Sequence, residues 1–416
     1  MKQFNSRRQK GYHKCLLPSV LLLLFLLYCF ILTRLHYGLD NCDTNQSLVS
    51  NNSFRKSDES SSLDRDKDKV SKMKPIAVVH VGPHKTGSTM IQSEMVRLSK
   101  ELELDGYTIL QKTDLPGGHK PSKTAATLAF AIKREREDVN IIFDFLKFMR
   151  KNKSLNRNIM VSSEEFSRPL EQVENVEWLF QPYFDVHIVV VYRNFYQWLS
   201  SLYFEWHKEL KDEFDSYEAW IAKQHTITSP ISVHPMQPAI VFREFNKKFA
   251  NITMINFHGK DGLVPEYFCS KEIGTKHACE QIQKEQKPIE FKNKGHTLEF
   301  RRLLNYAISK DLISKSLQAN EYTMKKTTKK IQDFYEQQSD RPPLNCLDRS
   351  IADHILKHTI EQELTYVPND FRKRGGESQF KKDFEKHYQS KMCALDIPAI
   401  VKQEKWISFF KSLEGK

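Results

Sequence analysis

The sequence lacks the usual signs of a metal-binding or nucleic-acid-binding protein. None of its seven cysteines and fifteen histidines follows a spacing typical of a zinc site, so no metal is expected. Half of the formal net charge of +12 lies in the first 34 residues, which contain six basic residues and no acidic one. The remainder is too weakly basic to indicate a nucleic-acid partner, but it is compatible with an anionic ligand. No internal repeat is present, which excludes a repeat architecture.

The N-terminal region lacks both a signal-peptide cleavage motif and the apolar periodicity of a core. Residues 16–33 are almost wholly apolar, and about 18 residues is close to the shortest helix that spans a bilayer. Most basic residues precede this segment, so we expect an uncleaved signal anchor with residues 1–15 in the cytosol. Residues 34–74 are polar, which predicts a lumenal stem before a folded domain over residues 75–416.

Cysteine use is typical of an oxidising compartment. Five cysteines follow the predicted anchor, and four cysteines can pair in three ways. Proximity favours Cys269 with Cys279, ten residues apart, and therefore Cys346 with Cys393. Cys42 in the stem is then the odd cysteine, which either links two chains as a homodimer or stays a free thiol. Four glycosylation sequons agree with a lumenal location, at Asn45, Asn51, Asn152 and Asn251.

Apolar, β-branched runs alternate with helical patterns along the folded domain. The predicted strands are Ile76–Val81, Tyr107–Leu110, Ile159–Ser162, Val186–Tyr192 and Ile252–Phe257. This alternation predicts an α/β fold of three layers with a central parallel sheet, whose ligands bind beyond the carboxyl ends of the strands. Beyond residue 280 the pattern predicts charged helices with little strand signal, such as Leu298–Ile313 and Met324–Gln338.

A glycine-rich loop joins the first predicted strand to the helical pattern that follows it. It reads Gly82-Pro83-His84-Lys85-Thr86-Gly87-Ser88-Thr89. Backbone N–H groups of such a loop, together with a helix N-terminus, bind phosphate groups. A nucleotide triphosphatase P-loop places its lysine directly after the second glycine, whereas Lys85 lies two residues before Gly87. A P-loop kinase is therefore disfavoured. We expect the loop to bind a phosphate through the backbone amides of Thr86, Gly87, Ser88 and Thr89.

A second anion site is predicted after the fourth strand. Arg193 and Asn194 follow the strand directly, and Ser201 lies eight residues after Arg193 on a predicted helix. A guanidinium fork suits a phosphate group, and the serine hydroxyl adds another donor. The two side chains can therefore converge on one phosphate.

These two segments resemble the sulfotransferases that use PAPS (3′-phosphoadenosine 5′-phosphosulfate), and above all the membrane-anchored Golgi type. The loop around Lys85 resembles the family's 5′-phosphosulfate loop, K-x-G-[ST]-T. Arg193 and Ser201 match its 3′-phosphate motif, although Phe195 stands where a proline is usual. The resemblance covers roughly residues 75–300. It implies a P-loop-like sulfotransferase fold, PAPS as the donor, no metal, and Lys85 as a catalytic and cofactor-binding residue.

Weaker similarities bear on the catalytic base and on a third part of the donor site. The segment Val161–Phe166 resembles a strand end, S-S-E-x-F, of the broader family, and Glu164 in it is the preferred base. Glu165 and His119 are alternatives. Arg374 and Gly375 faintly resemble the C-terminal 3′-phosphate loop of cytosolic members. The stretch 293–305 also looks shared, without an assigned role.

The resemblance implies transfer of a sulfuryl group to a hydroxyl of a carbohydrate acceptor in the Golgi lumen. The protein is then a single-pass type II membrane protein with no nucleic-acid partner. Two alternatives share these features. A protein-tyrosine sulfotransferase would keep the cofactor site with another acceptor cleft, and a catalytically silent scaffold would keep only fold and anchor. Joint retention of Lys85, Arg193 and Ser201 argues against the scaffold.

Overall fold

The described part of the chain lies within one unit, Lys72–Lys416. The computed structural model describes residues 74–111, 113–115, 124–134, 139–167, 172–208, 210, 212–225, 234–259, 261–285, 297–340, 342 and 344–414. The predicted anchor, the stem, Cys42 and His119 lie outside these residues. Among the helices that are described, none is both long and apolar enough to cross a membrane.

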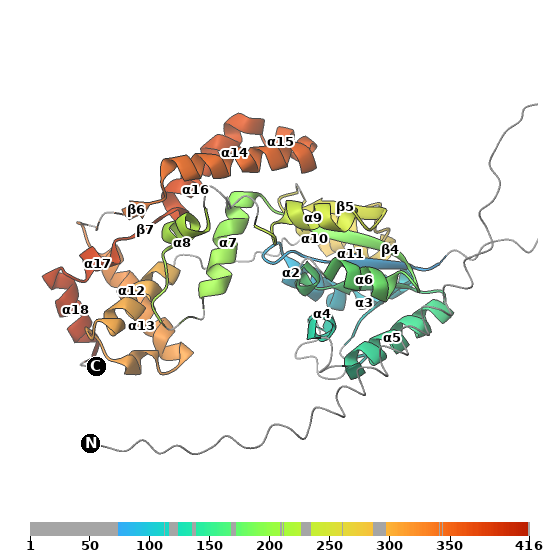
Figure 1. Ribbon diagram of the computed structural model, residues 1–416, viewed down its shortest axis with the longest axis horizontal. Coiled ribbons are helices and arrows are strands. Elements are labelled where there is room, and N and C mark those ends of the chain that lie inside the picture. Colours follow the sequence, from blue (N-terminus) through green and yellow to red (C-terminus); the bar gives the residue numbers. More distant parts are fainter. Residues whose placement is uncertain are drawn as a thin grey trace, which may run out of the picture. The chain divides into compact units, whose positions relative to one another are not determined.

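Five parallel strands form the central sheet, in the order β2-β3-β1-β4-β5. Figure 1 labels β4 and β5, two neighbouring strands of this sheet. The strands are β1 (Ile76–His80), β2 (Tyr107–Ile109), β3 (Asn158–Ser162), β4 (Asp185–Tyr192) and β5 (Asn251–Asn256). Each one begins and ends within one residue of a predicted strand. The predicted α/β class with a central parallel sheet is therefore confirmed.

Helices cover both faces of this sheet, because side chains of successive strand residues point to opposite faces. Val78 of β1 packs on one face, whereas Ala77 and Val79 pack on the other. The first face is covered by α2 (Ser88–Arg97), α3 (Ser99–Leu104), α10 (Leu263–Phe268) and α11 (Lys276–Glu285). The second is covered by α4 (Thr124–Arg134), α5 (Val139–Ser154), α6 (Gln172–Phe180) and α9 (Pro238–Asn246).

The other helices form two further hydrophobic clusters. The first is built mainly from α7 (Phe195–His207), α8 (Tyr217–Gln224), α14 (Arg349–Tyr366), α15 (Pro368–Lys373) and α16 (Gly376–Lys391). The second is built mainly from α12 (Thr297–Ser309), α13 (Glu321–Glu336), α17 (Ile397–Ile400) and α18 (Glu404–Glu414), with the 3-10 turn η4 (Lys315–Gln318) beside α13. Both helices predicted beyond residue 280 are present, as α12 and α13.

Two short strands differ from the expected all-helical C-terminal region. β6 (Leu344–Cys346) and β7 (Cys393–Leu395) pair antiparallel, with Cys346 opposite Cys393. Three residues are too few for an alternating pattern to be visible in the sequence. The disulfide Cys346–Cys393 joins these strands, and Cys269–Cys279 joins the end of α10 to α11. Both predicted disulfides are thus present.

One predicted glycosylation site is placed unfavourably. The Asn152 side chain on α5 is 3% exposed, and its amide donates a hydrogen bond of 2.8 Å to the carbonyl oxygen of Phe148. A glycan needs a surface asparagine, so this sequon is not available in the folded domain. Asn251, at the start of β5, is exposed.

Candidate functional site

The parallel strand register brings three chain segments together at one edge of the sheet. His80 at the end of β1 pairs with Ser162 of β3 on one side and with Val189 of β4 on the other. The segments that follow β1, β3 and β4 therefore begin close to one another. They contain all the residues predicted to bind the donor, apart from Arg374.

The loop after β1 has the backbone conformation that its glycines permit. Gly82 and Gly87 have φ angles of 92° and 91°, and Lys85 has a φ of 66°. A Cβ atom on Gly82 would lie 2.8 Å from Cα of Glu164, so the loop packs directly on the segment after β3. Only glycine permits both this approach and this φ without strain.

Lys85 is directed towards α7. Its Nζ lies 3.1 Å from Oε2 of Glu205, and the other carboxylate oxygen of Glu205 accepts a bond of 2.6 Å from Lys208. Burial tends to raise the pKa of Glu205, but the hydrogen bond from Lys208 and the charge of Lys85 outweigh this effect and lower it overall. Glu205 is thus ionised at neutral pH and neutralises Lys85.

Arg193 ties the start of α7 to the loop. Its Nη1 donates a bond of 2.8 Å to the carbonyl oxygen of Lys85, and the guanidinium lies 4.8 Å from the centre of the Phe257 ring. Arg193 is 9% exposed, and burial lowers its pKa to about 10, so it remains charged at neutral pH. Among the described residues, no carboxylate pairs with it and its Nε has no hydrogen-bond partner. A buried cation that no carboxylate neutralises favours an anionic ligand.

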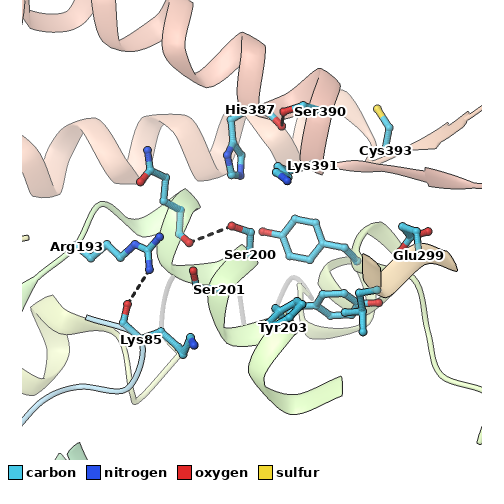
Figure 2. Close-up of a pocket in the computed structure, with 14 residues that line it drawn as sticks. Lys85, Arg193, Ser200, Ser201, Tyr203, Glu299, His387, Ser390, Lys391 and Cys393 are labelled. Atoms are coloured by element: carbon cyan, nitrogen blue, oxygen red, sulfur yellow. Dashed lines mark hydrogen bonds between the residues drawn. The ribbon is translucent and has the colours of Figure 1, made fainter. Parts of the chain in front are cut away.

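Lys85, Arg193 and Ser201 line one cavity of about 250 Å³. Figure 2 shows His387, Ser390 and Lys391 of α16 facing Arg193, which lies just before α7, and Ser201, which lies within α7. The remaining lining is polar or aromatic, with Gln197, Ser200, Tyr203, Phe204, Tyr217, Leu298, Glu299 and Cys393. Glu299 is paired with Arg302 at 2.6 Å, so the lysines and Arg193 dominate the charge of this cavity.

A second cavity of about 310 Å³ shares Gln197, His387 and Ser390 with the first. Arg374 lines it, together with the aromatic rings of Tyr196, Phe371 and Phe380. The Arg374 guanidinium is held by the fully buried carboxylate of Glu363. Arg374 therefore lies beside the Arg193 cavity and not within it, and Gly376 rather than Gly375 lines the same wall.

Two partly buried histidines lie near Arg193, one of them also near Arg374 and the other near Lys391. Burial and then the charges of Lys391 and Arg193 lower the pKa of His387 to about 3. His258 has a pKa of about 3 for similar reasons, burial first and then Arg193 and Arg374. Both rings are therefore neutral, and within the described part of the chain Nε2 of neither ring has a hydrogen-bond partner. Each ring can offer a hydrogen bond to a ligand in the cavities that it lines.

The four residues whose amides were predicted to bind a phosphate, Thr86–Thr89, lie around the first turn of α2. The Thr86 hydroxyl donates to the carbonyl oxygen of Pro83 at 2.7 Å, which stabilises the loop. Ser88 is buried, and its hydroxyl has no partner among the described residues. The first N–H groups of a helix have no partner within it, so those of Ser88 and Thr89 can bind an anion. None of Thr86–Thr89 lines the two cavities described above.

The candidate bases lie on the other side of the loop. Glu164 opens the 3-10 helix η2 (Glu164–Ser167) directly after β3, and its Oε2 accepts a bond of 2.9 Å from Nε2 of Gln92. Glu165 Oε1 lies 3.2 Å from Nε2 of His84. Neither glutamate lines the cavity that holds Lys85 and Arg193.

Several site residues were missed by the sequence analysis. His387, Ser390 and Lys391 follow the helical spacing i, i+3 and i+4, which places them on one face of α16. That spacing alone does not show which face is turned to the donor site, because α16 comes almost 200 residues after Arg193. Glu205 was missed because nothing in its own sequence context distinguishes it from a surface glutamate.

Comparisons of the chain with protein-family models, with curated proteins and with solved structures gave no match.

The loop geometry predicts that Gly82→Ala is much more harmful than Gly106→Ala. Both glycines have a positive φ, 92° and 82°, which costs alanine about 1 kcal/mol. Only Gly82 has a close neighbour, the backbone of Glu164, whereas nothing lies within 4 Å of a Cβ at Gly106. Overpacking should lower the free energy of unfolding by a further ~1–3 kcal/mol in Gly82→Ala. Urea unfolding measures both variants, and equal losses would contradict the proposed close packing.

Proposed function

We propose that the protein is a PAPS-dependent sulfotransferase of the Golgi type, with a P-loop-like sulfotransferase fold. In this proposal residues 16–33 anchor the chain in the membrane. The lumenal domain transfers a sulfuryl group to a hydroxyl of a carbohydrate acceptor. The main support is one cavity, in which Lys85 of the loop meets the buried, unneutralised Arg193 and the hydroxyl of Ser201.

The arrangement suits a donor with phosphate groups at two separate positions. Arg193 and Ser201 would bind the 3′-phosphate, because a guanidinium with a free N–H pairs well with phosphate oxygens. The first turn of α2 and the amides of Thr86–Thr89 would bind the 5′-phosphate. The neighbouring cavity has aromatic walls from Tyr196, Phe371 and Phe380, which suit a stacked purine base.

The proposed reaction is an in-line displacement at sulfur. The acceptor oxygen forms a bond to sulfur while the bond from sulfur to the bridging phosphate oxygen breaks. The acceptor proton passes to a base, and the bonding electrons leave with adenosine 3′,5′-bisphosphate. Lys85 would stabilise the charge that develops on the leaving oxygen.

Glu205 allows Lys85 to take this role, because its own carboxylate is not left unpaired. The carboxylate of Glu205 binds Lys85 through one oxygen and Lys208 through the other. When Lys85 turns to the donor, Glu205 retains Lys208 as its partner. Lys85 therefore exchanges one anion for another, which keeps the cost of its movement low.

Glu164 remains the proposed base. It follows β3 at the same edge of the sheet, and its backbone contacts the loop at Gly82. The amide of Gln92 orients its carboxylate by binding both Glu164 and the carbonyl oxygen of Ser162. A base held in this way needs little reorganisation to accept a proton.

The direct test is incubation of the full-length protein with PAPS carrying a labelled sulfuryl group, together with a panel of glycans and tyrosine peptides. We expect label in a glycan. Label only in tyrosine peptides would favour the alternative acceptor class, and no transfer together with equal binding of ATP and PAPS in calorimetry would refute the proposal.

Lys85→Ala should lose far more turnover than donor affinity. Loss of a group that stabilises a developing charge typically lowers the rate about a hundredfold or more. Affinity for adenosine 3′,5′-bisphosphate should change little, since Arg193 and the loop amides remain. Lys147→Ala, which removes a surface lysine paired with Asp144 on α5, is the matched control. Near-normal turnover of Lys85→Ala would show that the lysine is not catalytic.

Arg193→Lys should weaken binding of a 3′-phosphorylated nucleotide selectively. A lysine cannot copy the paired donors of a guanidinium, so we expect a loss of about 2 kcal/mol, about thirtyfold in affinity. Ser201→Ala removes a neutral donor and should cost ~1 kcal/mol. Adenosine 5′-phosphosulfate lacks the 3′-phosphate, and its affinity should hardly change in either variant.

The control for this comparison is Arg349→Lys, at an exposed arginine on α14. Calorimetry with both nucleotides decides between two roles of Arg193. If both nucleotides bind more weakly by the same factor, Arg193 supports the fold and the 3′-phosphate binds elsewhere, for example beside Arg374.

A further inference from the structure

We propose that His84, Glu164 and Glu165 form a binding site for a divalent metal ion of the zinc or manganese class. One ligand atom from each residue lies within 4.8 Å of the other two, and all three residues are partly buried. His84 comes from the loop after β1, and the two glutamates open η2 after β3. The sequence analysis expected no metal. Its search for local spacing could not find this site, because His84 and Glu164 are 80 residues apart in the chain.

The contact between His84 and Glu165 is the first argument. Nε2 of His84 is buried and lies 3.2 Å from Oε1 of Glu165, but their relative orientation does not allow a hydrogen bond. Nε2 has no hydrogen-bond partner among the described residues. Two ligands that each lie about 2.1 Å from one ion are separated by roughly 3–4 Å. The pair therefore has the spacing of two ligands of a shared ion.

The two carboxylates are the second argument. Glu164 and Glu165 are neighbours in a short 3-10 helix, where like charges are unfavourable unless a cation lies between them. Within the described part of the chain, neither lysine nor arginine pairs with Glu165. Gln92 binds Glu164 at 2.9 Å and is itself 3% exposed, so it orients this carboxylate as outer partners of metal ligands do.

The backbone that holds these side chains is fixed from several directions. The indole of Trp198 donates a bond of 2.9 Å to the carbonyl oxygen of His84. The N–H of Ser163, directly before Glu164, donates to the carbonyl oxygen of His80 at 3.0 Å. Ligation thus needs only rotation of side chains, not movement of the strands.

The ligand set determines the class of ion. Mg²⁺ and Ca²⁺ prefer oxygen ligands alone, whereas one imidazole nitrogen with two carboxylates suits Zn²⁺ or Mn²⁺. Three protein ligands also leave at least one position open for a water molecule or a ligand hydroxyl. The site is thus of the open type, next to the loop that carries Lys85.

Metal binding here stands on the geometry and does not depend on sulfuryl transfer. The two roles of Glu164 exclude each other while the ion is bound, because a carboxylate that binds an ion is not free to accept a proton. Turnover that survives complete metal removal would agree with Glu164 as the base.

Calorimetry on the full-length protein, stripped with EDTA and titrated with Zn²⁺ and Mn²⁺, tests the site. We expect one binding equivalent that His84→Asn or Glu165→Gln abolishes or weakens at least tenfold. Gln92→Ala should weaken it less than loss of a ligand does, about tenfold, since it removes only an orienting bond. The same ion should raise the melting temperature of the wild type and not that of His84→Asn.

The matched control is His277→Asn, because His277 also lies beside a carboxylate, with Nδ1 2.7 Å from Asp105, but at the surface. It should bind the ion as the wild type does. Melting curves without metal show whether each variant is folded. Equal stoichiometry and affinity in the wild type, His84→Asn and Glu165→Gln would overturn the proposal, whatever the result for sulfuryl transfer.

Discussion

The position of β1 between β3 and β4 in a parallel sheet is the constraint on which the site depends. Parallel pairing aligns the carboxyl ends of all three strands, so the loop after β1 has η2 on one side and the start of α7 on the other. Two contacts then fix the loop from these sides, Gly82 against the backbone of Glu164 and the carbonyl oxygen of Lys85 bonded to Arg193. Loss of either contact would change the position of Lys85 without touching its side chain.

The charge of Arg193 shows why this part of the molecule suits a ligand. A buried guanidinium normally pairs with a carboxylate, and even the partly exposed Arg374 pairs with that of Glu363 in the neighbouring cavity. Arg193 instead has a carbonyl oxygen, an aromatic ring and two neutral histidines nearby. Arg193 is more deeply buried than Arg374 and has no carboxylate partner among the described residues, so it suits an anionic ligand.

The sequence predicted the sheet almost to the residue, because each strand contains apolar, β-branched residues and most strands are buried. It also predicted that Lys85 lies in the loop after β1, that Arg193 follows β4 directly and that Ser201 lies on the next helix, since these positions follow from the strands. It did not show the contribution of α16, because that helix is amphipathic like any other and its partner face depends on packing with α7 and α14. β6 and β7 were not predicted either, because three residues are too few to show an alternating pattern, although the disulfide that joins them was predicted.

The side chains of two neighbouring loop residues lie beside different carboxylates. Lys85 reaches Glu205 on α7, whereas the side chain of His84 reaches Glu165 on η2. Lys85 has a positive φ, so the backbone turns here, and the side chains of His84 and Lys85 point in different directions. A donor at Lys85 would carry several negative charges, and the carboxylates of Glu164 and Glu165 after β3 would repel them. A cation among His84, Glu164 and Glu165 would reverse the sign of that field, so the anion site and the metal site would support each other's occupancy. The anion site and the metal site are thus tested by separate experiments, although a charged ligand in one would favour binding in the other.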